Sequence, residues 1–106
     1  MKRGEIWTLQ DRNYASKARP VVVIQSDKHS TFDSVILCLF TSFESDDINT
    51  RVCVKPSAEN GLQKVSYVMT DKIVTVDKEM LGSRVGILSK EDMIAVSEQL
   101  KVILDL

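Results

Sequence analysis

The sequence of 106 residues is poor in the residues that build specialised sites, with 2 cysteines, 1 histidine, 4 glycines and 2 prolines. One histidine cannot complete a zinc site with Cys38 and Cys53, and it cannot form a pair of catalytic imidazoles within one subunit. Glycine-rich phosphate loops and G-x-S-x-G elbows are also lacking, which argues against nucleotide hydrolysis and serine-hydrolase chemistry. Each cysteine lies in an apolar stretch, so we predict two buried, reduced thiols and no metal or cofactor.

Long apolar segments are lacking too. The longest run without a charge, residues 34–43, is much shorter than the ~20 residues that cross a bilayer. The N-terminus, MKRGEIW, has no apolar stretch of the kind found in a signal peptide. We therefore expect a cytoplasmic protein without a membrane partner. The length and the ordinary hydrophobic content of 43% predict one globular domain, residues 1–106.

The charge is nearly balanced but unevenly distributed. The net charge of −1 argues against a broad surface for polyanions. Residues 1–28 nevertheless hold more basic than acidic side chains, namely Lys2, Arg3, Arg12, Lys17, Arg19 and Lys28 against Glu5, Asp11 and Asp27. This pattern is compatible with a small basic site on a mildly acidic protein.

Short β-prone segments fill the first 88 residues. Apolar and β-branched runs predict strands at residues 5–9, 21–24, 34–42, 50–55, 65–69, 73–76 and 84–88. The run at residues 21–24 is apolar throughout, which is typical of a strand buried on both faces, and Pro20 suits its first position. Gly82 predicts the turn before the last strand.

The period changes near the end of the chain. Ser89 is a candidate N-cap with an acidic residue three positions later. Met93, Val96, Leu100 and Ile103 follow at spacings of three and four, which predicts an amphipathic helix packed on the sheet. A mainly β fold follows, an SH3-like barrel or curled antiparallel sheet with a C-terminal helix.

Arg19 is the most suggestive charged residue. It stands directly before Pro20 and a buried strand, and a guanidinium fixed there suits a phosphate because its planar fork binds two oxygens. The alternative is an ordinary ion pair with a carboxylate. Thr41 and Ser42 end the predicted third strand, where their hydroxyls either donate to a phosphate or form a turn. Asp71 either caps a turn or accepts a hydrogen bond from a bound base.

Several segments, in this order, resemble the MazF/PemK family of toxin endoribonucleases, which share a fold with the gyrase-poisoning CcdB toxins. The matching segments are KRGEIW at 2–7, KARPVVVI at 17–24, Thr41-Ser42, GLQKVSYV at 61–68, TDKIVTVDK at 70–78, Leu81-Gly82 and LSKEDM at 88–93. They cover nearly the whole chain.

The resemblance implies a homodimeric, metal-independent ribonuclease that cuts single-stranded RNA, with a cognate antitoxin as partner. Arg19 and Thr41 match the family's catalytic residues, and Lys17, Ser42, Asp71 and Tyr14 match positions around the RNA groove. The implied reaction is attack of a 2′-hydroxyl on the adjacent phosphorus, leaving a 2′,3′-cyclic phosphate and a 5′-hydroxyl. Arginine is a poor base because its pKa exceeds ~12, so Arg19 is expected to stabilise charge and donate a proton.

The sequence departs from the family pattern at several positions. The loop at residues 10–18 lacks the family's glycine-rich stretch, Met69 and Val74 replace basic residues of some relatives, and no arginine partner for Asp71 is evident. The family's cleavage sequences therefore do not transfer. Two alternatives remain open, a CcdB-like gyrase-binding toxin and a non-catalytic SH3-like module. The gyrase-binding relatives use a tryptophan in a C-terminal tail, whereas Trp7 is the only tryptophan here. Trp7 and Phe40 are apolar residues that we expect a homodimer to cover.

Overall fold

The computed structural model describes residues 1–10, 18–45 and 47–106. Its strands are β1 (Glu5–Leu9), β2 (Arg19–Val23), β3 (Ser34–Thr41), β4 (Val52–Val54), β5 (Ser66–Asp77) and β6 (Leu81–Ile87). Two short 3-10 helices, η1 (Asp27–His29) and η2 (Lys78–Met80), and one α-helix, α1 (Lys90–Leu104), complete the described elements. The fold is mainly β with a C-terminal helix, as predicted.

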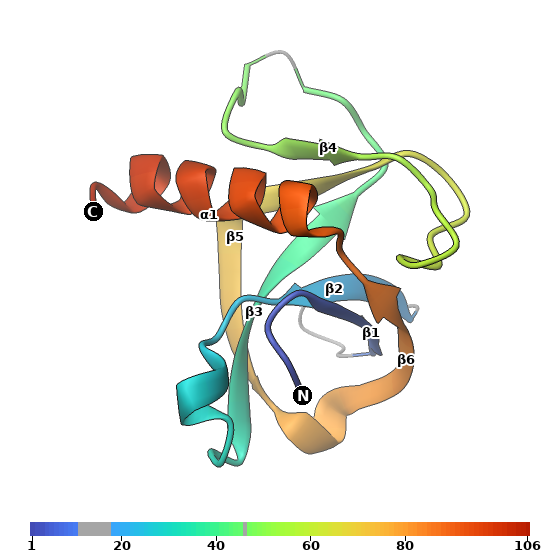
Figure 1. The fold of residues 1–106 in the computed structure, drawn as a ribbon, viewed down its shortest axis with the longest axis vertical. Coiled ribbons are helices and arrows are strands. Elements are labelled where there is room, and N and C mark those ends of the chain that lie inside the picture. The colour runs from blue at the N-terminus through green and yellow to red at the C-terminus, as the bar shows by residue number, and fades with distance from the viewer. Residues whose placement is uncertain (11–17, 46) are drawn as a thin grey trace.

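The strands form one six-stranded antiparallel sheet in the order β4-β5-β3-β2-β1-β6. The sheet curls strongly, and α1 lies across one side of it against β4 and β5 (Figure 1). Because the sheet curls, both of its faces are covered and each has an apolar cluster. Along β2, Val22 enters one cluster while Val21 and Val23 enter the other, which confirms a strand buried on both faces.

The predicted pair of strands at residues 65–69 and 73–76 is wrong, since β5 runs unbroken through both. Leu39 of β3 pairs with Met69, and the neighbouring Cys38 pairs with Ile73. Residues 70–72 therefore have no partners on β3 and form a bulge, which bends β5 without ending it. The polar residues 70–72 suggested a break between two strands, but the bulge accommodates them within one strand.

The turn before β6 is formed by η2 and not by Gly82, which lies inside β6. The predicted C-terminal helix agrees better with the structure. Ser89 caps α1, because its Oγ accepts a hydrogen bond from the Asp92 N–H at 3.1 Å. Val96 and Leu100 are buried in the cluster on that side of the sheet, but Ile103 is 42% exposed. The last turn of α1 therefore extends past the core it was expected to cover.

Two burial predictions also need correction. Cys38 is buried as expected, but Cys53 is exposed because β4 turns Val52 and Val54 inward and alternation turns Cys53 outward. Phe40 is only 6% exposed and lies in the apolar cluster beneath α1. The protomer therefore covers Phe40 without a partner, whereas Trp7 is half-buried.

Candidate functional site

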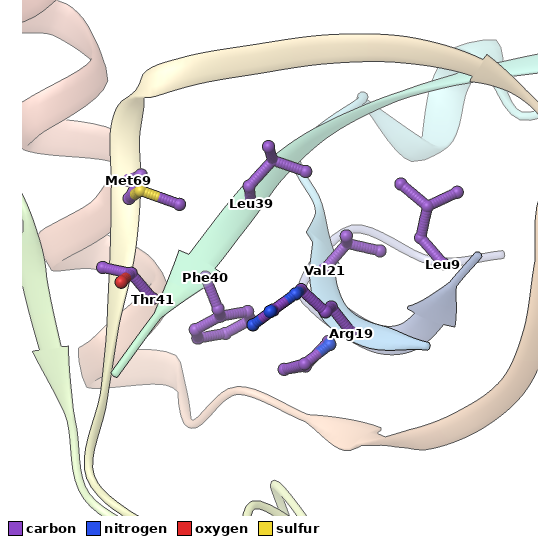
Figure 2. A pocket seen from close by; sticks show the side chains of 8 residues that line it. Leu9, Arg19, Val21, Leu39, Phe40, Thr41 and Met69 are labelled. Atoms are coloured by element: carbon purple, nitrogen blue, oxygen red, sulfur yellow. The ribbon is translucent and has the colours of Figure 1, made fainter. Parts of the chain in front are cut away.

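Arg19 and Thr41 line the same pocket, a hollow of about 270 Å³. Val21 of β2 pairs with Leu39 of β3, so continuing this antiparallel register by two residues on each strand brings Arg19 level with Thr41. Both side chains then lie on one face of the sheet. The other lining residues are apolar: Leu9, Val21, Leu39, Phe40 and Met69, which Figure 2 labels, and Pro20. Arg19 and Thr41 were separate candidates in the sequence, and the sheet brings them to one pocket.

Arg19 is the first residue of β2 and is held by its neighbours on both sides. It pairs with Leu9 of β1, and Pro20 fixes the following backbone angle. Its side chain is exposed, and within residues 1–10, 18–45 and 47–106 no carboxylate forms an ion pair with it. The expected alternative, a strand-end arginine neutralised by an acid, therefore finds no support in the described part of the chain.

Thr41 is the last residue of β3, and its hydroxyl is oriented by the turn that follows. The Phe43 N–H donates a hydrogen bond to Thr41 Oγ1 at 3.2 Å. This bond occupies a lone pair of the oxygen and leaves the hydroxyl proton free to donate elsewhere. The turn-forming role and the phosphate-binding role of Thr41 are therefore compatible.

The other candidates for RNA binding lie in different places. Ser42 follows β3 and is exposed, but it is not among the pocket-lining residues that the structure describes. Lys17 and Tyr14 lie outside the described residues.

Asp71 lies on the bulge of β5 and has a partner that the sequence did not reveal. Arg51, just before β4, donates from Nε to Oδ1 at 3.0 Å and from Nη2 to Oδ2 at 3.1 Å. Only 14% of the Arg51 side chain and 19% of the Asp71 side chain are exposed. The hydrogen bonds from Arg51 hold the pKa of Asp71 below its ordinary value, and they raise the pKa of Arg51. Asp71 thus ties the bulge to β4, and its contact with RNA stays a prediction.

The sequence did not single out Tyr67, and it marked Met69 only as an apolar replacement for a basic residue of some relatives. Met69 lines the pocket, and Tyr67 pairs with Thr41 on one side and with Cys53 on the other. Only the pairing of β5 with β3 and β4 identifies them, because neither residue stands out from the rest of β5. A tyrosine thus lies one strand away from the threonine of the pocket.

The remaining titratable groups do not form a second centre in the described residues. Burial raises the pKa of the Cys38 thiol to about 12, so this cysteine is a core residue and a poor nucleophile. No group of three or more His, Cys, Asp or Glu side chains in residues 1–10, 18–45 and 47–106 is placed to hold a metal ion. The described helices include none long and apolar enough to cross a membrane.

Comparison with known proteins shows the family of the chain. Residues 2–104 match the family described as the PemK-like, MazF-like toxin of type II toxin–antitoxin systems. A probable endoribonuclease MazF of Mycolicibacterium smegmatis (strain ATCC 700084 / mc(2)155) is 38% identical over 105 residues, which cover 98% of this chain and 96% of the relative.

Two solved structures share the fold over nearly the whole chain. The Mycobacterium tuberculosis toxin MazF-mt6 has a TM-score of 0.81 and 27% identity, covering 96% of this chain and 97% of its own. An endoribonuclease in complex with its cognate antitoxin, from a mycobacterial species, has a TM-score of 0.85 and 24% identity, covering 100% of this chain and 96% of its own. The chain therefore belongs to the PemK-like, MazF-like toxins of type II toxin–antitoxin systems.

Proposed function

We propose that this MazF-type toxin endoribonuclease cleaves single-stranded RNA in the pocket formed by Arg19 and Thr41. In the proposed reaction, a ribose 2′-oxygen attacks the adjacent phosphorus while the bond from phosphorus to the 5′-oxygen breaks. The 2′-hydroxyl loses its proton and the leaving 5′-oxygen gains one. The products are a 2′,3′-cyclic phosphate and a 5′-hydroxyl, and no metal is required.

Each of the two residues has a distinct role in this proposal. The guanidinium of Arg19 donates to two phosphate oxygens at once and stabilises the charge that accumulates on the phosphorane. Thr41 donates its free hydroxyl proton to one of those oxygens. Leu9, Leu39 and Met69 line the same pocket and offer no polar side chain that would compete for the phosphate. A guanidinium has donors and no acceptor, so Arg19 acts as a donor and charge stabiliser and not as the base.

One observation carries this proposal: Arg19 and Thr41, at the ends of the neighbouring strands β2 and β3, line one pocket. The chemistry is tested by incubating the protein with mixed RNA in EDTA and analysing the ends of the fragments. We expect discrete fragments with cyclic phosphate and 5′-hydroxyl ends. Fragments with 5′-phosphate ends, or cleavage that requires added metal, would contradict the proposed reaction.

The same assay tests the role of Thr41. Thr41→Ala should slow cleavage by roughly 10-fold or more, because a neutral hydrogen bond to the phosphorane is lost. Thr41→Ser keeps the hydroxyl and should retain most of the rate. A wild-type rate for Thr41→Ala would remove the Thr41 hydroxyl from the mechanism.

The gyrase-binding alternative predicts inhibited DNA supercoiling without RNA cleavage, and an SH3-like binding module predicts neither effect. The relatives found are named endoribonucleases, which favours the RNA reaction. We further propose messenger RNA as the single-stranded substrate, in keeping with the expected cytoplasmic location. The family match over residues 2–104 supports one catalytic domain across residues 1–106.

The proposed partners are a second copy of the chain and an antitoxin. Several apolar side chains stay exposed on α1, which supports a homodimer: Ile94 at 53%, Val102 at 64%, Ile103 at 42% and Leu104 at 50%. We expect a disordered acidic segment of the antitoxin to fold over the pocket around Arg19, so that its carboxylates take the place of RNA phosphates. Binding should then compete with uncleavable RNA and weaken with salt. Simultaneous binding of both ligands at undiminished affinity would show that inhibition is allosteric.

A further inference from the structure

A row of four residues crosses the sheet beside the pocket. Cys53 of β4 pairs with Tyr67 of β5, and Tyr67 pairs with Thr41 of β3. The pairing of β2 with β3 ends at Val21 and Leu39, and two residues further along each strand Arg19 and Thr41 line the pocket together. Paired residues of antiparallel strands have side chains on the same face, with neighbouring Cα atoms roughly 5 Å apart. The row therefore runs from Arg19 and Thr41, which share the pocket, through Tyr67 to Cys53.

Tyr67 and Cys53, the two residues beyond Thr41 in the row, both have surface in contact with solvent. Tyr67 is half-buried and Cys53 is exposed, so part of the tyrosine side chain is accessible to solvent. Desolvation raises the pKa of Tyr67, and the nearby Glu44 carboxylate and Cys53 thiol raise it further. The ring thus stays uncharged next to a phosphate site, with its position set by its neighbours on β4 and after β3.

The other described aromatic side chains are not placed in this way. Phe40 touches the pocket but is only 6% exposed and belongs to the cluster beneath α1, and Phe32 lies beside His29, before the start of β3. Trp7 donates to Glu5 on β1 and is packed against the other apolar cluster. Phe43 is 78% exposed in the turn after β3. Among the described residues, Tyr67 is the aromatic ring held on the sheet directly beside Thr41.

We propose that Tyr67 forms a base-stacking subsite for the nucleotide next to the scissile phosphate, so that the RNA strand runs from Arg19 and Thr41 across β5 towards Cys53 on β4. This inference rests on the proposed reaction at Arg19 and Thr41 and extends it. Flat aromatic rings bind unpaired bases by stacking, with little dependence on base identity. Tyr67 therefore contributes affinity and fixes the direction of the strand.

Cys53 makes the proposal testable without a label, because it is exposed while Cys38 is buried in the core. The probe is an RNA that the protein cuts, with the 2′-hydroxyl at the cut site replaced by hydrogen. Saturating amounts of this RNA should slow alkylation of Cys53 at least ~10-fold. A control protein carries Cys53→Ser together with Glu79→Cys, which moves the reactive thiol to η2 beyond the far end of β5. Its alkylation rate should not change.

Affinity for the same RNA gives the second measurement. Tyr67→Ala should weaken binding by about 5- to 150-fold, the range for loss of one stacked base. Tyr67→Phe keeps the ring and should stay within about 2-fold of the wild type. Unchanged melting of both variants would show that the fold is intact. If Tyr67→Ala melts early, the Cys53 protection of the wild-type protein still decides the question.

The possible failures are distinguishable. An RNA that binds through Arg19 but leaves Cys53 fully reactive overturns the Tyr67 subsite and leaves the proposed reaction standing. Loss of affinity in Phe43→Ala, with Tyr67→Ala unchanged, also overturns it, because the strand would then leave by the turn after β3. Failure of the protein to bind or cut any RNA overturns the proposed function together with the subsite.

Discussion

The ion pair between Arg51 and Asp71 should be an energetic clamp that holds the bulge of β5 against β4. Both oxygens of Asp71 accept from the guanidinium, at 3.0 and 3.1 Å, and the two side chains are only 14% and 19% exposed. Hydrogen bonds to charged groups contribute about 1.5–3 kcal/mol each, and removing one partner of a fully buried pair costs about 3–5 kcal/mol. Because both side chains keep some contact with water, we expect Asp71→Asn to cost about 2–3 kcal/mol.

A double-mutant cycle isolates the pair. Asp71→Asn, Arg51→Met and the double variant are unfolded in urea at pH 7 and at one fixed protomer concentration. The coupling energy should be about 1.5–2.5 kcal/mol. The pair Glu98 and Lys101 on α1 is the control, because its atoms are 3.8 Å apart and its side chains are 63% and 61% exposed. Exposed pairs of this kind should show a coupling of ~0.5 kcal/mol or less.

The coupling should also depend on pH with a definite sign. The pKa of Asp71 is lowered in the folded state, so the unfolded state takes up protons first as the pH falls. The stabilisation is therefore complete above the unfolded pKa of ~4 and is lost as the pH falls through the lower, folded value. A coupling at pH 7 no larger than that of the control pair, or one that does not decline in acid, would refute the clamp.

Other predictions concern stability and thiol chemistry. Asn60 is 2% exposed, and its amide makes three hydrogen bonds to loop backbone, so Asn60→Ala should cost about 2–3 kcal/mol in urea unfolding. Gly61 has φ +68°, and a Cβ there would press on the Val85 carbonyl oxygen, so Gly61→Ala should lower the melting temperature by at least ~4 °C. A thiol reagent should modify one cysteine in the native protein, Cys53, and two after denaturation. Because the pKa of Cys38 is about 12 when folded, the free energy of unfolding should fall above pH ~9, and less so in Cys38→Ala.

The sequence predicted the fold well where local patterns determine it. The apolar run after Pro20 became a strand buried on both faces, and Ser89 caps the helix as its spacing predicted. It failed where tertiary pairing overrides the local pattern. Polar residues 70–72 read as a break, but Thr70 donates to the buried carbonyl of Thr50 at 2.8 Å, and β5 continues through the bulge.

The site was also predicted only where local patterns mark its residues. Arg19 and Thr41 carried local signals, a proline on one side and a strand end on the other. Tyr67 carried none, because its position beside Thr41 depends on strands that are separated in sequence by a long connection. Arg51 likewise meets Asp71 only through the pairing of β4 with β5. The sequence of a single strand does not show which residues of other strands will lie beside it in the sheet.

The most direct test of the account is the single-turnover cleavage rate of Arg19→Ala in EDTA. Arg84→Ala is the matched control, because Arg84 is an arginine on β6 whose side chain is 47% exposed and pairs with Glu5. Loss of a donor that stabilises the transition state costs about 10²- to 10³-fold in rate. We predict a loss of that size for Arg19→Ala, wild-type melting, and a rate within ~3-fold of the wild type for Arg84→Ala. A folded Arg19→Ala protein that cuts RNA at the rate of the Arg84→Ala control would contradict the central claim.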